Sequence, residues 1–194
     1  MSAERTFRRA TGREGATFGR LARRGNDLPA LLLIEFSYDT TTNLSLRRKP
    51  TYDILIQQMR GEVTRLGAQE LRTPEEVDAV LPNAKGTMLV VVNSTCGCAA
   101  GAARPALAKA LQHPNVPEKI ATVFAGLDKE ATARAREYFT DQPPSSPSFA
   151  LMRDGKFVHM IHRYEIEGRN PDQVASTLKQ AFDRFCVSAE KQAV

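Results

Sequence analysis

The 194-residue sequence has no tryptophan, only three cysteines and no apolar run long enough to cross a membrane. A transmembrane helix needs about 20 consecutive apolar residues, whereas the run from Leu28 to Phe36 is short and contains a proline and a glutamate. Three cysteines, an odd number, argue against the disulfide framework of a secreted protein. Arg23 and Arg24 are similar to a twin-arginine export signal, but no small-residue cleavage pattern follows them. We therefore expect a cytoplasmic protein without a membrane partner.

An excess of charge of one sign is confined to the N-terminal region. Residues 1–50 hold ten Lys/Arg and five Asp/Glu, which accounts for the whole net charge of +5. The rest of the chain is balanced, so it offers no basic face for nucleic acid. We interpret residues 1–49 as a basic extension that is disordered or non-native, with a basic arm for an acidic partner as the alternative. The folded domain is expected over residues 50–194.

From residue 50 onward, helical and strand-like patterns alternate. The segment Thr87–Val92 is apolar throughout and rich in β-branched residues, which is typical of a strand buried on both faces. Apolar residues at helical spacing predict a helix whose buried face holds Tyr52, Leu55, Met59, Val63 and Leu66. The other predicted elements are a strand at 68–71, a helix beginning with a capping box at Thr73 and Glu76, an Ala-rich helix over 99–111 with a kink at Pro105, a strand at 120–125, a helix capped by Asp128, a β-hairpin over 148–161 and a helix beginning at Asn170. This order predicts an α/β fold, a mixed sheet with helices on both faces and a C-terminal β-hairpin plus helix.

Cys96 and Cys98 lie between the buried strand and the Ala-rich helix. Ligands of open α/β sheets bind at the carboxyl ends of strands, and the N–H groups at a helix start lower the pKa of a thiol placed there. Because only a thiolate attacks a disulfide, we predict that Cys96 is the nucleophile and Cys98, within the first turn and less exposed, the resolving thiol. Gly97 supplies the backbone freedom for a disulfide between them. We expect this small ring to be strained and easily reduced.

A second candidate element is Ser146-Pro147, directly before the predicted hairpin. The predicted order of elements resembles that of a thioredoxin-like fold, in which this position holds a cis-proline opposite the catalytic cysteines, and cis peptide bonds are almost confined to X-Pro. We therefore predict a cis Ser146–Pro147 bond whose backbone pairs with an extended client beside Cys96. Thr95, Gly97, Ser146 and Pro147 are assigned to substrate binding.

The same cysteine pair also permits an alternative, a metal-binding or iron-handling module. A zinc site normally needs four ligands, and the candidates for the others are Cys186, His113, His159 and His162. Only His159 and His162 are close in sequence, and on a strand their side chains would point to opposite faces. Cys186 is interpreted as packing at the edge of the core, and Arg104 and Lys109 as residues on a solvated helix face.

The residues around the cysteine pair resemble a known family. The run Val91–Pro105, with Ser-Thr-Cys-Gly-Cys at its centre, is similar to the signature of the bacilliredoxins, small bacterial thioredoxin-like proteins with a Cys-Gly-Cys motif. Residues 59–62, residues 71–78 and residues 147–149 also resemble that family, and the resemblance covers about residues 50 to 185.

The resemblance implies a thioredoxin-like fold and a thiol–disulfide oxidoreductase that removes bacillithiol from mixed disulfides on client proteins. Cys96 would attack the mixed disulfide and Cys98 would assist release. Bacillithiol would then be a thiol co-substrate, bacillithiolated client proteins would be the partners, and no cofactor would be tightly bound. Weak disulfide isomerase activity would also fit.

Overall fold

The computed structural model describes residues 50–186, so the predicted N-terminal extension over residues 1–49 lies outside the described residues. The helices are α1 (Pro50–Thr64), α2 (Pro74–Val80), α3 (Arg104–Ala110), α4 (Lys129–Glu137) and α5 (Pro171–Phe185), with a π-helical turn at Ala99–Ala103 and a 3₁₀ turn at Arg163–Glu165. The strands are β1 (Gln69–Glu70), β2 (Thr87–Asn93), β3 (Lys119–Phe124), β4 (Ser148–Arg153) and β5 (Lys156–Ile161). Apart from the 3₁₀ turn, each falls on a segment for which the sequence predicts the same kind of structure.

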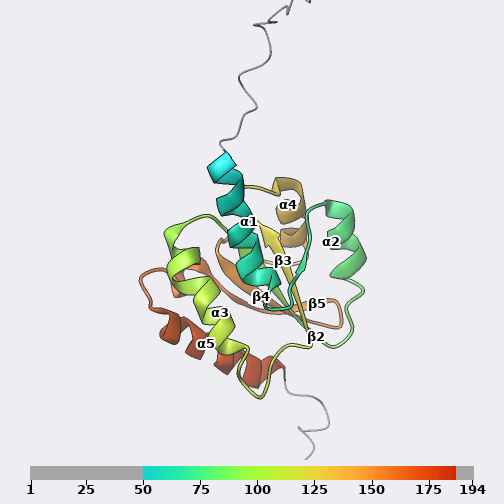
Figure 1. The fold of residues 1–194 in the computed structure, drawn as a ribbon. Coiled ribbons are helices and arrows are strands. Elements are labelled where there is room, and N and C mark those ends of the chain that lie inside the picture. The colour runs from blue at the N-terminus through green and yellow to red at the C-terminus, as the bar shows by residue number, and fades with distance from the viewer. Residues whose placement is uncertain (1–49, 187–194) are drawn as a thin grey trace, which may run out of the picture. The chain divides into compact units, whose positions relative to one another are not determined.

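The strands form one five-stranded sheet in the order β1-β3-β2-β4-β5 (Figure 1). β3 is parallel to both β1 and β2, whereas β4 is antiparallel to β2 and to β5. The predicted mixed sheet with a C-terminal hairpin and helix is thereby confirmed. This arrangement of strands is that of a thioredoxin-like fold.

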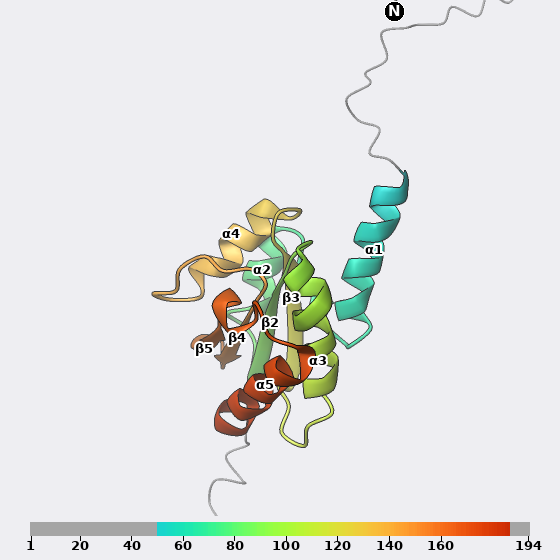
Figure 2. The ribbon, with the colours of Figure 1, turned by 90° about the vertical axis from the view of Figure 1, so that its left-hand side faces the viewer.

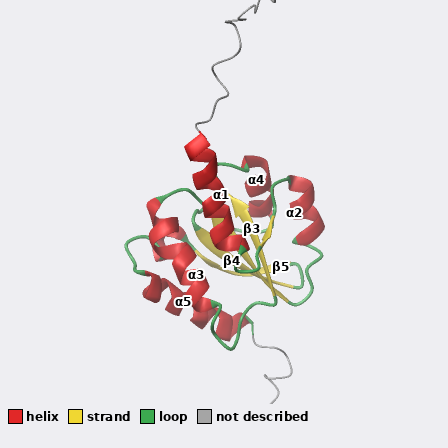
Figure 3. Ribbon diagram, viewed as in Figure 1, coloured by secondary structure: helices red, strands yellow, loops and turns green. Residues whose placement is uncertain are grey.

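Helices cover both faces of the sheet, and β2 lies buried between them (Figures 2 and 3). Leu89 and Val91 of β2 pack with residues of α3 and α5. Val90 and Val92, which alternate with them, pack with residues of α2 and α4 on the opposite face. Because successive side chains of a strand point to opposite faces, an uninterrupted apolar strand can serve both cores.

Local signals in the sequence account for several boundaries. Thr73 and Glu76 form the predicted capping box at the start of α2. Asp154 and Gly155 both have positive φ, 51° and 75°, as a two-residue hairpin turn requires. The Ala-rich helix begins as a π-helical turn, in which the Arg104 N–H donates to the carbonyl of Ala99, and Pro105 lies in the first turn of α3 that follows. No helix within residues 50–186 combines the length and apolar character needed to cross a bilayer.

The predicted buried face of α1 is wrong at its N-terminal end and holds at its C-terminal end, where Val63 is buried and Leu66 packs against the core. Tyr52 and Leu55 are each 44% exposed, and of the predicted five only Val63 is fully buried. Figure 2 shows the N-terminal half of α1 projecting away from the rest of the described chain. The residues that turn inward include Ile56 and Arg60. The helix and the turn after it therefore contact the rest of the domain through Val63 and Leu66, as the spacing indicated, and also through Ile56 and Arg60, which it did not indicate.

Ion pairs explain why an arginine takes part in this contact. Arg60 donates hydrogen bonds of 2.8 and 2.9 Å to Asp128 and also pairs with Glu70. Its guanidinium lies 5.1 Å from the ring centre of Phe124, and the hydrogen bond with Asp128 raises the pKa of Arg60. Asp128 precedes α4 as predicted but makes no capping bond with its side chain, because its carboxylate oxygens accept from Arg60. A buried charge is tolerated when it is paired and hydrogen-bonded in this way.

Candidate functional site

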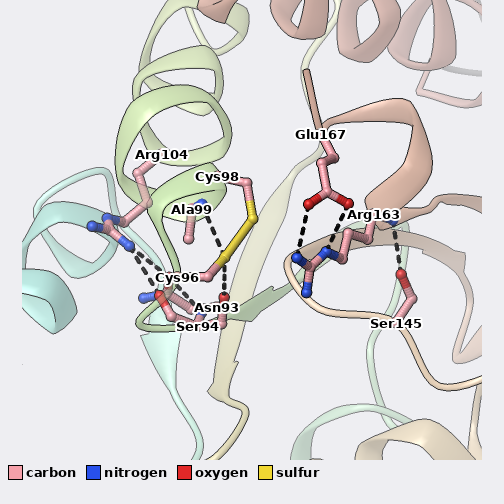
Figure 4. The surroundings of a disulfide bond; sticks show 9 residues. All are labelled: Asn93, Ser94, Cys96, Cys98, Ala99, Arg104, Ser145, Arg163 and Glu167. Carbon is pink, nitrogen blue, oxygen red and sulfur yellow. Dashed lines mark hydrogen bonds and ion pairs between the residues drawn. A yellow bond between two sulfur atoms is a disulfide. The ribbon is translucent and has the colours of Figure 1, made fainter. Parts of the chain in front are cut away.

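Cys96 and Cys98 are joined by a disulfide just beyond the carboxyl end of β2 (Figure 4). Their Cα atoms lie 5.5 Å apart, within the usual range for disulfides. Thr95 and Gly97 are exposed, and both cysteines are half-buried. The pair is therefore accessible from solvent, and exposure alone does not distinguish the two cysteines.

Hydrogen bonds do distinguish them. The backbone N–H of Ala99 donates to Cys96 Sγ at 3.3 Å, and Ser94 Oγ lies 3.2 Å from the same sulfur. The carbonyl of Cys96 accepts from the N–H groups of Ala99 and Ala100, so Cys96 stands where a capping residue stands before a helix. Within the described residues no hydrogen bond reaches the sulfur of Cys98. The Cys96 sulfur is thus the one of the two that accepts a hydrogen bond from a backbone N–H at the helix start.

A buried arginine holds the segment before Cys96 in place. Arg104 Nε donates to Glu62 at 2.6 Å, and its Nη1 donates to the carbonyl of Ser94 at 3.1 Å and to Asn93 Oδ1 at 3.3 Å. Asn93 Oδ1 also accepts from the Ser94 N–H at 2.9 Å. The Arg104 side chain is only 3% exposed, so the prediction that it lies on a solvated face is wrong. The guanidinium can be buried because three acceptors, on Glu62, Ser94 and Asn93, bind it.

Sequence reasoning missed Asn93, Ser94, Glu62 and Arg104 as parts of this site. Three of them lie in the run 91–105 and one in the run 59–62, both of which carry the family resemblance. The family resemblance therefore covers all four residues. The ion pair between Glu62 and Arg104, however, joins residues 42 positions apart in the sequence. Lys109, by contrast, is exposed as predicted and pairs with Asp172 at the surface.

The loop before β4 lies beside the cysteine pair. β4 runs antiparallel to β2 with Ser148 opposite Val92, so the residues before Ser148 neighbour those after Val92. The Ser146–Pro147 bond is cis, as predicted. Figure 4 shows Ser145 of this loop among the surroundings of the disulfide. The fold thus brings together the two segments that the sequence analysis assigned to substrate binding.

The histidines considered as metal ligands have other partners. His159 stacks on Phe185 with ring centres 5.0 Å apart, and burial lowers its pKa. His162 Nε2 lies 2.9 Å from Gln142 Oε1. His113 Nε2 lies 2.7 Å from an Asp183 carboxylate oxygen.

Cys186 is a free, half-buried thiol that packs against the core at the end of α5, as the sequence analysis proposed. Burial raises the pKa of Cys186 to about 11. Among residues 50–186, no three His, Cys, Asp or Glu side chains are grouped so that they could hold a metal ion. In that part of the chain, the metal-binding alternative has only the sulfurs of Cys96 and Cys98 as grouped candidate ligands.

Comparisons with known proteins agree with this geometry. A protein family described as disulphide isomerase matches residues 52–186. A bacilliredoxin of Geobacillus kaustophilus is 54% identical over 137 residues, which cover 71% of this chain and 94% of that protein. The chain belongs to the bacilliredoxin family. A bacilliredoxin of Koribacter versatilis is 52% identical over 69% of this chain and 92% of its own length.

A thioredoxin of Fasciola hepatica is also similar to this bacilliredoxin chain, with 20% identity and a TM-score of 0.43 over 60% of this chain and 98% of that one. Family membership, with the cysteine pair and the mixed sheet described above, identifies a thiol oxidoreductase of thioredoxin-like fold.

Proposed function

We propose that this bacilliredoxin removes bacillithiol, or a similar low-molecular-weight thiol, from mixed disulfides on client proteins in the cytoplasm. The observation that carries the proposal is the pair of contacts at Cys96 Sγ, one from the Ala99 N–H and one with the Ser94 hydroxyl. Both groups can donate a hydrogen bond to a sulfur that bears negative charge. The names of the relatives support bacillithiol as the thiol co-substrate, and the proposal requires no tightly bound cofactor.

The first step would be an attack by the Cys96 thiolate on the sulfur of the cap. A Cys96–cap disulfide forms, the bond between cap and client breaks, and the client leaves as a thiolate that takes up a proton. The N–H groups at the helix start favour the thiolate over the thiol. The exposed residues Thr95 and Gly97, together with the backbone of Ser146 and Pro147, would receive the client beside this sulfur.

Cys98 would complete the cycle. Its thiolate attacks Cys96 Sγ, the Cys96–Cys98 disulfide forms, and the cap departs as a free thiol. The structure contains the pair in this oxidised form. An external thiol reductant would then return both cysteines to the reduced state. The description of the matching family as disulphide isomerase supports a weak isomerase activity that uses the same nucleophile.

The test is release of bacillithiol from a client protein by the reduced chain. We expect wild type and Cys186→Ser to release it and Cys96→Ala to be inactive. Cys98→Ser should transfer one cap to Cys96 and stop there, which mass spectrometry of the intact protein detects. Equal release by wild type and Cys96→Ala would rule out the proposed nucleophile.

A further inference from the structure

A hollow of about 380 Å³ lies between the loop at 143–146 and the segment that follows β5. His162, Arg163, Tyr164 and Glu167 line it on the side of β5. Figure 4 shows Ser145, Arg163 and Glu167 among the surroundings of the disulfide. Its volume falls within the range of small-molecule sites and is far too small for a folded client. Three residues of the hollow thus belong to the surroundings of the disulfide, and its volume fits a ligand of modest size.

Hydrogen bonds fix the two walls of the hollow relative to each other. The Arg163 N–H donates to Ser145 Oγ at 2.8 Å, and Ser148 Oγ donates to the carbonyl of Ser145 at 2.9 Å. His162 Nε2 lies 2.9 Å from Gln142 Oε1. The bonds of Arg163 and His162 tie the segment after β5 to the loop before β4, and the bond of Ser148 holds that loop, so the shape of the hollow is set before a ligand arrives.

The hollow presents one positive and one negative group side by side. Arg163 Nη2 and Nε donate to the two carboxylate oxygens of Glu167 at 2.9 and 3.2 Å, and this contact lowers the pKa of Glu167. Their side chains are 47% and 58% exposed. Exposed ion pairs contribute little free energy, so a ligand with its own charged groups can replace the pair at small cost.

Tyr164 supplies a flat aromatic surface at the same place. It is 74% exposed and stacks on His162 with ring centres 5.3 Å apart. An exposed aromatic ring that is held in one orientation by a stacked neighbour is suited to contact with a small organic ligand. The hollow therefore offers a ligand an aromatic ring at Tyr164, a positive group at Arg163 and a negative group at Glu167.

We propose that this hollow binds the thiol cap itself, and that Arg163 and Glu167 are the residues that recognise a cap carrying both a carboxylate and an ammonium group. The carboxylate would pair with Arg163, whose fork of donors suits carboxylate geometry, and the ammonium would pair with Glu167. The sulfur of the cap would then lie at Cys96 while the client extends along the loop. This inference rests on the proposed function and names the groups by which that site selects its substrate.

Four caps on one client peptide test the assignment. The caps are L-cysteine (both charged groups), 3-mercaptopropionate (carboxylate only), cysteamine (ammonium only) and 2-mercaptoethanol (neither). Each is transferred to full-length Cys98→Ser protein, and the second-order rate of the Cys96–cap adduct is measured by mass spectrometry. For each variant, the rate is divided by that of the Cys98→Ser parent with the same cap, which removes the intrinsic reactivity of each disulfide.

Arg163→Gln should slow transfer of the two carboxylate caps about tenfold, as expected for loss of a charge-assisted hydrogen bond. The transfer rate of 2-mercaptoethanol should stay within about twofold of the rate in the parent. Glu167→Gln should slow the two ammonium caps in the same way. The double variant should remain slow with L-cysteine, because the loss comes from missing contacts and not from repulsion by Glu167. Arg72→Gln, which removes an exposed arginine paired with Glu70, is the matched control and should change no rate.

Two outcomes would overturn the assignment: unchanged rates in the Arg163 and Glu167 variants, or an equal slowing with all four caps, since the hollow would then act on the client or on Cys96. Failure of the proposed function gives a different result, because the parent protein would then form no adduct with any cap.

Discussion

The backbone N–H of Ala99 donates a 3.3 Å hydrogen bond to the sulfur of Cys96. The donor belongs to the first turn of a helix, and it bonds to Cys96 and not to Cys98. We expect the same donor to remain available when the disulfide is reduced, which gives the bond a measurable consequence.

Reduced Cys96 should therefore react with iodoacetamide at a lower pH than an ordinary thiol. We expect the alkylation rate of Cys96 in Cys98→Ser/Cys186→Ser protein to reach half its maximum below the ~8.5 of an unperturbed cysteine. The Cys96→Ser/Cys186→Ser protein reports Cys98 under the same conditions and should require a higher pH. A higher midpoint for Cys96 than for Cys98 would contradict the proposed roles.

Ser94 should contribute to this effect through its hydroxyl, which lies 3.2 Å from Cys96 Sγ. Ser94→Ala removes one hydrogen bond to the charged sulfur, and we expect it to raise the pH midpoint of Cys96 alkylation by about one unit. Thr95→Ala is the matched control, because Thr95 is an exposed neighbour. If the Ser94 variant keeps the wild-type midpoint, the hydroxyl does not stabilise the thiolate.

Arg104 should matter for the stability of the whole domain. Arg104→Leu leaves the buried Ser94 carbonyl without its donor and Glu62 without its partner, and Asn93 Oδ1 keeps only the Ser94 N–H. We expect a loss of about 3 kcal/mol in the free energy of unfolding. Urea denaturation of the reduced proteins measures it. Lys109→Gln removes an exposed ion pair with Asp172 and should stay within about 0.5 kcal/mol of wild type. Similar unfolding midpoints for the Arg104 variant and wild type would show that the network is dispensable.

Cys186 should be protected in the native protein. Burial raises its pKa to about 11, which is above the ordinary value, so the thiolate appears only as the pH rises toward 11. At pH 8 roughly one molecule in a thousand would carry the reactive form. We therefore expect iodoacetamide at pH 8 to modify Cys96 in the native reduced chain and to reach Cys186 only after denaturation. Peptide mapping that finds equal labelling of both residues without denaturant would refute this.

The parts of the fold that were predicted correctly depend on residues close together in sequence. The capping box joins Thr73 and Glu76, and the hairpin turn depends on Asp154 and Gly155. The buried strand β2 was recognisable because its residues are apolar on both faces. In each case the signal and the structure that it produces lie within one short segment.

The predictions that failed concern which side of a helix faces inward. Tyr52 and Leu55 were expected in the core from their spacing, and Arg104 was expected in solvent because it is charged. Each expectation considered one helix alone. The orientation of α1 also depends on carboxylates of Glu70 and Asp128, and that of Arg104 on Glu62 and the loop at 93–94.

The amino-acid sequence by itself determined that a cysteine pair stands between a buried strand and a helix, because β-branched runs, proline and capping residues act locally. Only the tertiary structure decided which sulfur receives the helix N–H, that a buried arginine holds the segment before it, and that a hollow with paired charges lies in the surroundings of the disulfide. The physical reason is distance along the chain: Glu62 meets Arg104 across 42 positions and Arg60 meets Asp128 across 68, and such contacts exist only once the helices have packed on the sheet.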